Sequence, residues 1–251
     1  MKKVLCMINM CLRTFLGIFV FVVVITLLMF LFVVLLPFKR LRIRVANEVG
    51  AALALFVVWL LNVKIQSENK PLPEQEPCIF VGNHTSTLDL FLQLILGVKR
   101  NLTIAKWELI FVPFLGLAYY LSGHGIINRQ NRKSAIKSMN KVATYSKKYR
   151  YSLWIWPEGT RSRDGRLQPF KKGFAHFALQ TGFPVVPVVI HHAYEKWSKG
   201  KMFNLHRFVL RVYYADPIPT TDWKLETLNE HVESVRQVFI EHLEESQRPL
   251  T

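Results

Sequence analysis

Residues 15–36 constrain the fold of this chain more than any other segment, because they form an apolar run of 22 residues. Only Gly17 and Thr26 interrupt its large apolar side chains. As an α-helix the run would be about 33 Å long, which is enough to cross the ~30 Å hydrocarbon core of a bilayer. A cleaved secretory signal usually has an apolar region of only ~7–15 residues followed by a small-residue cleavage site, and neither feature fits this run. We therefore expect a retained membrane helix.

A second apolar stretch at residues 49–61 would be a helix of only about 20 Å, which falls short of the bilayer core. Basic residues flank the first run on both sides: Lys2, Lys3, Arg13, Lys39, Arg40, Arg42 and Arg44. A spanning hairpin would place one basic flank outside, against the positive-inside bias. Either both helices dip into one leaflet, or one spans and the other lies at the interface. We favour the first arrangement, in which residues 1–70 form a two-helix membrane anchor and every charge stays on the cytoplasmic face.

The remaining chain, residues 71–251, has the pattern of one α/β domain. Residues 71–77 contain three prolines and two glutamates, which is typical of a linker. Residues 183–190 are rich in Val and indicate a buried strand, and residues 208–214 alternate apolar and polar side chains as another strand. Apolar residues spaced by three and four between positions 225 and 243 predict a final amphipathic helix.

A polar cluster at residues 83–89, Asn-His-Thr-Ser-Thr-Leu-Asp, follows a short apolar run bounded by proline and glycine. That run predicts a buried strand ending in a turn, and the apolar residues 88–96 before Gly97 predict a helix. Asp89 then lies in the first turn of the helix. Residues five apart do not share a helix face, so a contact with His84 requires His84 to lie in the loop. In that geometry Asp89 would fix the tautomer of the imidazole.

A simpler interpretation of this cluster is also open. Ser86 and Asp89 have a capping-box-like spacing, in which Asp89 only stabilises the helix start, and His84 could be an ordinary surface residue. A second cluster favours a site, because the apolar run at residues 151–156 is again followed by a polar turn, Pro157-Glu158-Gly159-Thr160-Arg161. Two strand ends that carry polar groups are expected to contribute to one site.

These motifs resemble those of the 1-acylglycerol-3-phosphate acyltransferase family, within the glycerolipid acyltransferases that share an N-H-x-x-x-x-D motif. His84 and Asp89 match that motif. Gly123-x-x-Ile126-x-x-Arg129 resembles a second motif, whose middle residue is more often Phe. Glu158-Gly159-Thr160-Arg161 resembles a third, which commonly has Phe where this chain has Trp156. One such match occurs by chance, but several in the family's order do not.

Two further segments extend the resemblance, which covers about residues 70–220. Val186-Pro187-Val188 is similar to a fourth, largely structural motif. Lys106-Trp107-Glu108-Leu109, followed by Pro113 and Gly116, is similar to a segment whose Lys is associated with the phosphate of the acceptor.

The resemblance implies an α/β fold in which helices flank a mixed sheet, as in glycerol-3-phosphate acyltransferase, with an N-terminal two-helix membrane anchor. It implies transfer of a fatty acyl chain from an acyl thioester, acyl-CoA or acyl carrier protein, to the free sn-2 hydroxyl of lysophosphatidic acid, giving phosphatidic acid. The expected catalytic residues are His84, the general base, and Asp89. The residues expected to bind substrate are Lys106, Arg129, Glu158, Gly159, Thr160 and Arg161.

The residues themselves favour direct transfer, because the sequence has no G-x-S-x-G elbow and no plausible nucleophilic Cys. Arg129, Arg161 and Lys106 would hold the acceptor phosphate. Glu158 would orient the acceptor, unless it is a turn carboxylate paired with a neighbouring Arg. No cofactor besides the thioester co-substrate is expected, and the three cysteines lack metal-ligand spacing. Acylation of another lysophospholipid or a lyso-aminolipid, thioester hydrolysis, and non-catalytic binding to anionic membranes remain alternatives.

The formal net charge of +16 indicates anionic partners. Residues 129–172 contain thirteen Lys or Arg and only two acidic residues, so this region should attract anionic lipid headgroups, the phosphates of acyl-CoA, or acyl carrier protein. Its lysines would also suit a solvated helix face. Nucleic acid is not an expected partner, because no nucleic-acid-binding module is recognisable.

The catalytic domain is expected on the cytoplasmic face, at the inner membrane of a bacterium or the endoplasmic reticulum of a eukaryote. Residues 83–85 and 101–103 are glycosylation sequons. In a eukaryotic lumen the first could carry a glycan beside His84, although such tripeptides often go unused.

Overall fold

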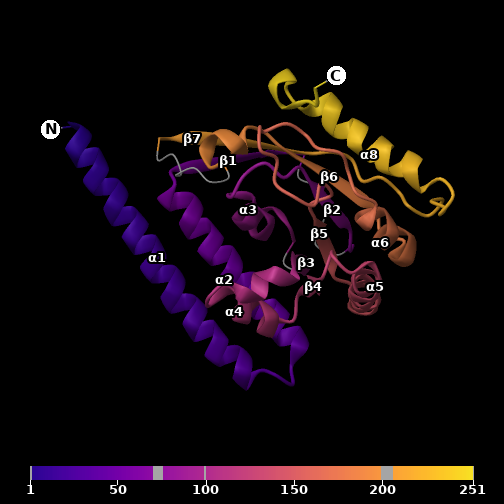
Figure 1. Ribbon diagram of the computed structural model, residues 1–251, viewed down its shortest axis with the longest axis horizontal. Coiled ribbons are helices and arrows are strands. Elements are labelled where there is room, and N and C mark those ends of the chain that lie inside the picture. The colour runs from indigo at the N-terminus through magenta and orange to yellow at the C-terminus, as the bar shows by residue number, and fades with distance from the viewer. Residues whose placement is uncertain (1, 70–75, 99, 199–205, 251) are drawn as a thin grey trace.

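A seven-stranded sheet forms the centre of the protein in the computed structural model, which describes residues 2–69, 76–98, 100–198 and 206–250 (Figure 1). The strands are β1 Val63–Glu68, β2 Ile79–Gly82, β3 Asn101–Lys106, β4 Gly125–Ile127, β5 Ser152–Ile155, β6 Val185–Ile190 and β7 Phe208–Tyr214. Their order across the sheet is β1-β7-β6-β2-β5-β3-β4. β6 and β7 are antiparallel and the other neighbouring pairs are parallel. The sheet is therefore mixed, as the resemblance implied.

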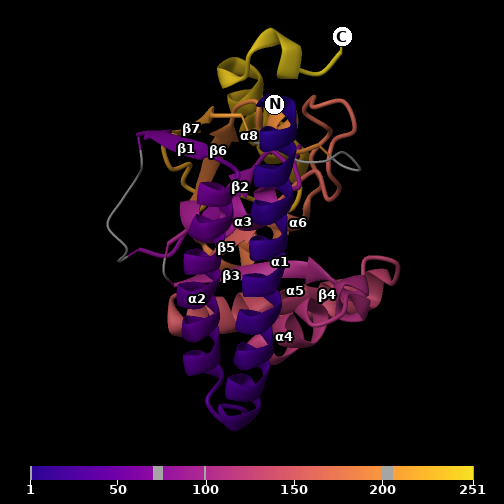
Figure 2. The same ribbon diagram turned by 90° about the vertical axis from the view of Figure 1, so that its left-hand side faces the viewer.

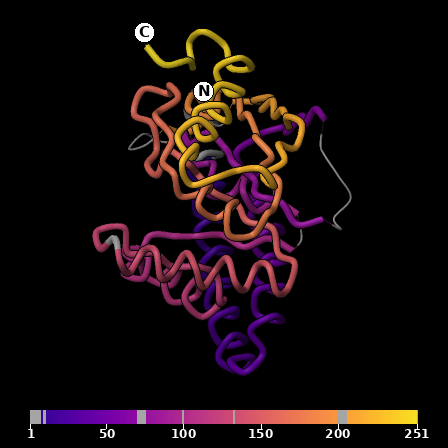
Figure 3. Tube along the Cα trace, turned by 90° about the vertical axis from the view of Figure 1, so that its right-hand side faces the viewer, coloured from indigo at the N-terminus to yellow at the C-terminus, as the bar shows by residue number. Residues whose placement is uncertain are grey.

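Helices cover both faces of the sheet (Figures 1 and 3). They are α1 Lys2–Val34, α2 Lys39–Leu60, α3 Asp89–Leu96, α4 Leu115–Ser122, α5 Arg132–Tyr149, α6 Gly173–Thr181, α7 Ala193–Lys196 and α8 Leu228–His242, with 3-10 helices η1 Trp107–Phe111 and η2 Glu245–Gln247. Successive strand residues point to opposite faces. Ile79 packs in the core beneath α5, α6 and α8, and Phe80 packs in the core beneath α3 and the end of α2.

Within residues 71–251, the strands and helices predicted from apolar patterns are confirmed to within a few residues. The run before the first polar cluster forms β2, and the run before the second forms β5, so each cluster follows a strand. The final amphipathic helix is α8, in which Val235 and Phe239 are fully buried.

The first two helices run antiparallel (Figure 2), and Nη1 of Arg13 in the first half of α1 donates to the carbonyl of Leu60 at the end of α2, 3.1 Å away. Residues 11–34 and all of α2 are long and apolar enough to cross a membrane. The predicted length of the second helix was wrong, because α2 has 22 residues, about 33 Å, and begins well before the apolar stretch. Its charged first half is helical because Ile43 and Asn47 are buried against the domain.

The sheet begins before the predicted domain boundary between residues 70 and 71. β1 pairs with β7 along its whole length, from Val63 opposite Phe208 to Glu68 opposite Tyr213. Val58 of α2 also packs in the same core as α3. The second helix of the expected anchor is thus joined to the sheet by packing and by β1. Most of the predicted linker at residues 71–77 lies outside the described residues.

Helix α4 packs against the two N-terminal helices on one side of the molecule (Figure 2). Leu28 and Phe32 of α1, Leu53 of α2 and Ala118 of α4 are buried in one apolar cluster. This small core is separate from the two that flank the sheet.

Candidate functional site

The two polar clusters meet at one edge of the sheet. β2 and β5 are neighbouring parallel strands, with Val81 opposite Ile155, so the loops that follow them leave the sheet side by side. β3 and β4 end at the same edge, because both are parallel to β5 across the sheet. Ligands of open α/β sheets bind in crevices at the carboxyl ends of strands.

His84 lies in the loop after β2 and contacts Asp89 at the start of α3, as predicted. Nδ1 of His84 is 2.8 Å from Oδ2 of Asp89, whose side chain is fully buried. The His84 ring also stacks on Trp156, with 4.7 Å between ring centroids and 19° between planes. The Asp89 carboxylate orients Nδ1 as the donor, which leaves Nε2 as the nitrogen that can accept a proton.

Asp89 also stabilises the loop before its helix. Oδ2 accepts hydrogen bonds from the backbone N–H of Thr85 at 2.8 Å and of Ser86 at 2.7 Å. Asp89 therefore orients His84 and holds the loop with one carboxylate oxygen. The predicted capping box is not formed, because the N-cap residue of α3 is Leu88 and no side chain caps this helix start. Holding the loop with the same atom fixes where His84 can lie.

Glu158 connects the two loops through buried hydrogen bonds. Oε1 accepts from the backbone N–H of His84 at 2.5 Å, and Oε2 accepts from the backbone N–H of Gln168 at 2.9 Å. Burial raises the pKa of Glu158 to about 8, although these two hydrogen bonds oppose the shift. Among the described residues, no ion pair joins Glu158 to an Arg. Because both oxygens accept hydrogen bonds from backbone N–H groups, the Glu158 carboxyl group holds the loops after β2 and β5 in position relative to each other.

Two further contacts join these loops. The backbone N–H of Ser162 donates to the carbonyl of His84 at 2.8 Å, and Nη1 of Arg161 donates to Oγ1 of Thr87 at 2.7 Å. Thr160, which precedes Arg161, is exposed. The loop that bears His84 is thus held near both ends by the loop that follows β5.

Arg129 follows β4 and reaches the loop after β5, where its Nη1 donates to the carbonyl of Gly159 at 2.5 Å. Burial lowers the pKa of Arg129, and Glu108 partly opposes this. Gly159 has φ +74°, and a Cβ there would lie 2.9 Å from Nζ of Lys171 and 3.1 Å from Nη1 of Arg129. Only glycine allows two cations to approach the chain so closely. Lys106 is exposed at the end of β3, at the same sheet edge.

Sequence reasoning assigned no role to Asn83, Trp156 or Lys171. The side chain of Asn83 is buried and exchanges two hydrogen bonds with the backbone of Ile190, at 2.9 and 2.8 Å, which ties the end of β2 to the end of β6. Asn83 and Trp156 stand inside the motifs, which is the signal that could have identified them. Lys171 belongs to no motif, so only the folded structure reveals that it lies next to Gly159.

A cavity of about 420 Å³ adjoins this site. Trp156 and Gly159 line it, together with the apolar side chains of Ile104 and Phe174. Arg129, Lys171 and His176 supply its basic groups. An apolar cavity with cationic groups suits an amphiphile with an anionic head.

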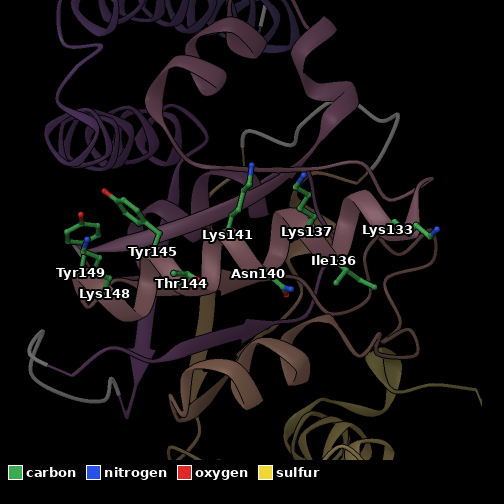
Figure 4. Close-up of a pocket in the computed structure, with 9 residues that line it drawn as sticks. All are labelled: Lys133, Ile136, Lys137, Asn140, Lys141, Thr144, Tyr145, Lys148 and Tyr149. Atoms are coloured by element: carbon green, nitrogen blue, oxygen red, sulfur yellow. The ribbon is translucent and has the colours of Figure 1, made fainter.

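A larger, open groove of about 770 Å³ follows the outer side of α5 and is lined by Lys133, Ile136, Lys137, Asn140, Lys141, Thr144, Tyr145, Lys148 and Tyr149 (Figure 4). It shares Ile136 and Asn140 with the smaller cavity, so the two adjoin. Lys39 Nζ lies 4.3 Å from the ring of Tyr145, which adds a cation from the start of α2. The predicted basic region is therefore a continuous surface next to the site.

Comparison with known proteins gives a consistent result. The family model described as Acyltransferase matches residues 64–191. The 1-acyl-sn-glycerol-3-phosphate acyltransferase of Cocos nucifera is 41% identical over 217 residues, which cover 86% of this chain and 70% of that protein. The enzyme of the same name from Limnanthes douglasii is 36% identical over 86% of this chain and 76% of its own length.

One solved structure is similar over nearly the whole chain. It is the crystal structure of the 1-acyl-sn-glycerophosphate (LPA) acyltransferase PlsC from Thermotoga maritima, with a TM-score of 0.69 and 24% sequence identity. The match covers 96% of this chain and 97% of that one. The similarity therefore includes the two N-terminal helices as well as the sheet.

Proposed function

Because the chain belongs to the acyltransferase family, and within it to the 1-acyl-sn-glycerol-3-phosphate acyltransferases, we propose that it acylates the free sn-2 hydroxyl of lysophosphatidic acid and produces phosphatidic acid. The observation that carries this proposal is the contact between His84 and the buried Asp89, with Arg161 bonded to Thr87 in the same loop and Arg129 bonded to Gly159 in the adjoining loop. A base next to phosphate-binding groups suits an acceptor that carries both a hydroxyl and a phosphate.

His84 acts as general base in this proposal. Nε2 removes the proton of the acceptor hydroxyl while that oxygen attacks the thioester carbonyl, and the C–S bond then breaks. The leaving thiolate takes the proton back from the imidazolium, so the base is regenerated. Asp89 stabilises the imidazolium, because its carboxylate lies 2.8 Å from Nδ1. General-base catalysis of this kind typically contributes roughly 10²–10⁴ in rate.

Arg129 and Arg161 are proposed to bind the acceptor phosphate, with Lys106 contributing charge from the end of β3. Nη1 of Arg129 donates to the carbonyl of Gly159, and Nη1 of Arg161 donates to the hydroxyl of Thr87, so both side chains are held in position. Their other guanidinium N–H groups can then donate to phosphate oxygens in a fixed orientation. Glu158 is proposed to position these loops rather than to touch the acceptor, since both of its oxygens are bonded to backbone N–H groups.

The acyl donor is proposed to be acyl-CoA or acyl carrier protein, with no further cofactor. The basic groove of α5 supports both, because it could bind the phosphates of one or the acidic surface of the other next to the cavity. Comparing the two donors at equal acyl chain length, with Lys137→Glu and Lys141→Glu variants, would identify the donor that uses this groove.

The protein associates with membranes through its two apolar N-terminal helices, and we propose that the catalytic domain lies on the cytoplasmic face. The basic residues around α1 favour that side. Asn83 and Asn101 of the two sequons are both buried, so a glycan on either would be incompatible with this fold. Protease protection of sealed membrane vesicles of known orientation tests the proposed side.

An acceptor panel tests the proposed reaction. Purified protein in mixed micelles would receive labelled acyl thioester and either lysophosphatidic acid, lysophosphatidylcholine, a lyso-aminolipid or no acceptor. We expect labelled diacyl product with lysophosphatidic acid well above the other acceptors. Thiol release without acceptor would favour a hydrolase, and preferred use of another lysolipid would contradict the proposed substrate.

A further inference from the structure

The segment that joins β3 to β4 carries an exposed apolar surface. η1, α4 and the turn between them present Ile110, Phe111, Val112, Phe114, Leu117 and Tyr120, which are 38 to 68% exposed. We call these six residues the α4 apolar surface. No charged side chain occurs from residue 109 to residue 122. Contiguous apolar surfaces of this kind mark sites of interaction rather than ordinary solvent-facing surface.

The α4 apolar surface is continuous with the exposed side of α1. Leu28 and Phe32 of α1 share a buried cluster with Ala118 of α4, so the two helices are in contact. The outward residues of α1 include Leu27 and Phe30, which are 63% and 70% exposed. Figure 2 shows α1, α2 and α4 together on one side of the molecule. A single apolar environment can therefore cover both helices at once.

We propose that the α4 apolar surface inserts into the lipid bilayer beside α1, as a third membrane-contacting element. A bilayer is the occupant that fits, because α1 already has the length and composition of a membrane helix and the α4 apolar surface extends its exposed side. Tyr120, which is 61% exposed, adds an aromatic side chain of the type enriched at membrane–water interfaces.

This position places the substrate-binding residues close to the lipid surface. Lys106 immediately precedes η1, and Oε1 of Glu108 in η1 accepts a hydrogen bond from Nε2 of Gln130 at 3.4 Å, next to Arg129. An acceptor that remains partly in the bilayer would present its phosphate near the carboxyl ends of β3 and β4. The insertion itself does not depend on which acceptor the enzyme uses.

Depth-dependent fluorescence quenching tests the insertion. The full chain with Cys6 and Cys11 replaced by Ser would carry Phe111→Cys, labelled with nitrobenzoxadiazole and reconstituted into phosphatidylcholine–phosphatidylglycerol vesicles. Cys78 should stay unlabelled, because it is buried and burial raises the pKa of its thiol to about 12. Leu27→Cys is the membrane control, and Leu225→Cys, also 63% exposed but in the segment before α8, is the solvent control.

We expect doxyl-labelled acyl chains to quench the probes at positions 111 and 27 and to leave the probe at position 225 bright. Quenching at position 27 without quenching at position 111 would overturn the proposal. A probe at position 111 that is shielded only at high protein concentration in detergent would overturn it too, and would identify a second copy as the occupant.

A kinetic comparison gives an independent readout. The double variant Phe111→Ser, Leu117→Ser should raise the KM for lysophosphatidic acid presented in vesicles several-fold and leave turnover of a short-chain, water-soluble acceptor unchanged. Leu225→Ser is the matched control and should change neither. Equal losses with both acceptors would contradict a role in membrane contact. Failure of the proposed reaction would remove this kinetic readout but not the quenching result.

Discussion

Oδ2 of Asp89 lies 2.8 Å from Nδ1 of His84 and also accepts hydrogen bonds from the backbone N–H of Thr85 and Ser86. Oδ1, its second oxygen, has no hydrogen-bond partner among the described residues. One oxygen atom therefore holds both the imidazole and the loop. The charge of this carboxylate and its role as a hydrogen-bond acceptor can be separated by substitution.

Asp89→Asn should preserve the fold and lower kcat. An Asn oxygen can replace Oδ2 and keep all three hydrogen bonds, whereas the negative charge that stabilises the imidazolium is lost. We expect kcat to fall at least about ten-fold, equivalent to 1.4 kcal/mol of transition-state stabilisation, with an unchanged circular dichroism spectrum. Asp89→Ala should lower both activity and thermal stability, because it also removes the acceptor. A fully active Asp89→Asn variant would show that the charge is not needed.

Gly159→Ala should impair the site through both the backbone and the added methyl group. A non-glycine residue at φ +74° costs roughly 1–2 kcal/mol, and the new Cβ would displace Arg129 and Lys171. Gly182→Ala is the matched control, because its φ is +72° and a Cβ there meets nothing within 4 Å. Both variants should lose similar stability in thermal unfolding, but only Gly159→Ala should raise the KM for the acceptor. A similar rise in Gly182→Ala would contradict a local effect.

Arg161→Ala should weaken acceptor binding more than turnover. Loss of a charged hydrogen bond to phosphate costs about 1.5–3 kcal/mol, which corresponds to roughly a ten- to hundred-fold higher KM for lysophosphatidic acid. Arg163→Ala provides a control that removes an equal charge two residues away, at an exposed position. Steady-state kinetics at varied acceptor concentration measure both. Equal effects of the two substitutions would indicate general electrostatics instead of a specific clamp.

Glu158 should make stability depend on pH. Burial raises its pKa to about 8, above the ordinary value of ~4.3. Between these values the folded state holds a proton that the unfolded state has released. Glu158 therefore lowers the free energy of unfolding as the pH rises between these two pKa values, by up to roughly 1.4 kcal/mol per pH unit. This effect levels off above about pH 8. Glu158→Gln should remove this contribution from unfolding midpoints measured in detergent between pH 5 and 9. An identical pH dependence in the variant would contradict it.

How much of the site could be predicted depended on sequence separation. His84 and Asp89 are five residues apart within one strand–loop–helix unit, so local patterns were sufficient to predict their contact. Glu158 bonds the backbone of His84 across 74 positions, and Asn83 bonds Ile190 across 107. Those contacts depend on which strands are neighbours in the sheet. In a sequence, a Glu whose carboxylate bonds backbone N–H groups cannot be distinguished from a Glu whose carboxylate faces a substrate.

Prediction of the fold was likewise limited to elements that local patterns specify. Apolar periodicity located β2, β5, β6, β7 and α8, because burial alone selects those residues. It underestimated α2, whose first half carries charged residues and is helical because Ile43 packs against the domain. The pairing of β1 with β7 likewise depends on residues more than 140 positions apart, such as Val63 and Phe208.

The role of His84 as general base is tested most sharply by the rates at which purified wild-type protein and His84→Ala convert lysophosphatidic acid and a labelled acyl thioester into phosphatidic acid. Thermal unfolding of both proteins should confirm that the variant is folded. We predict a loss of roughly 10²–10⁴ in kcat with little change in the KM for lysophosphatidic acid. Equal rates from the two proteins would show that His84 is not the base and would contradict the mechanism.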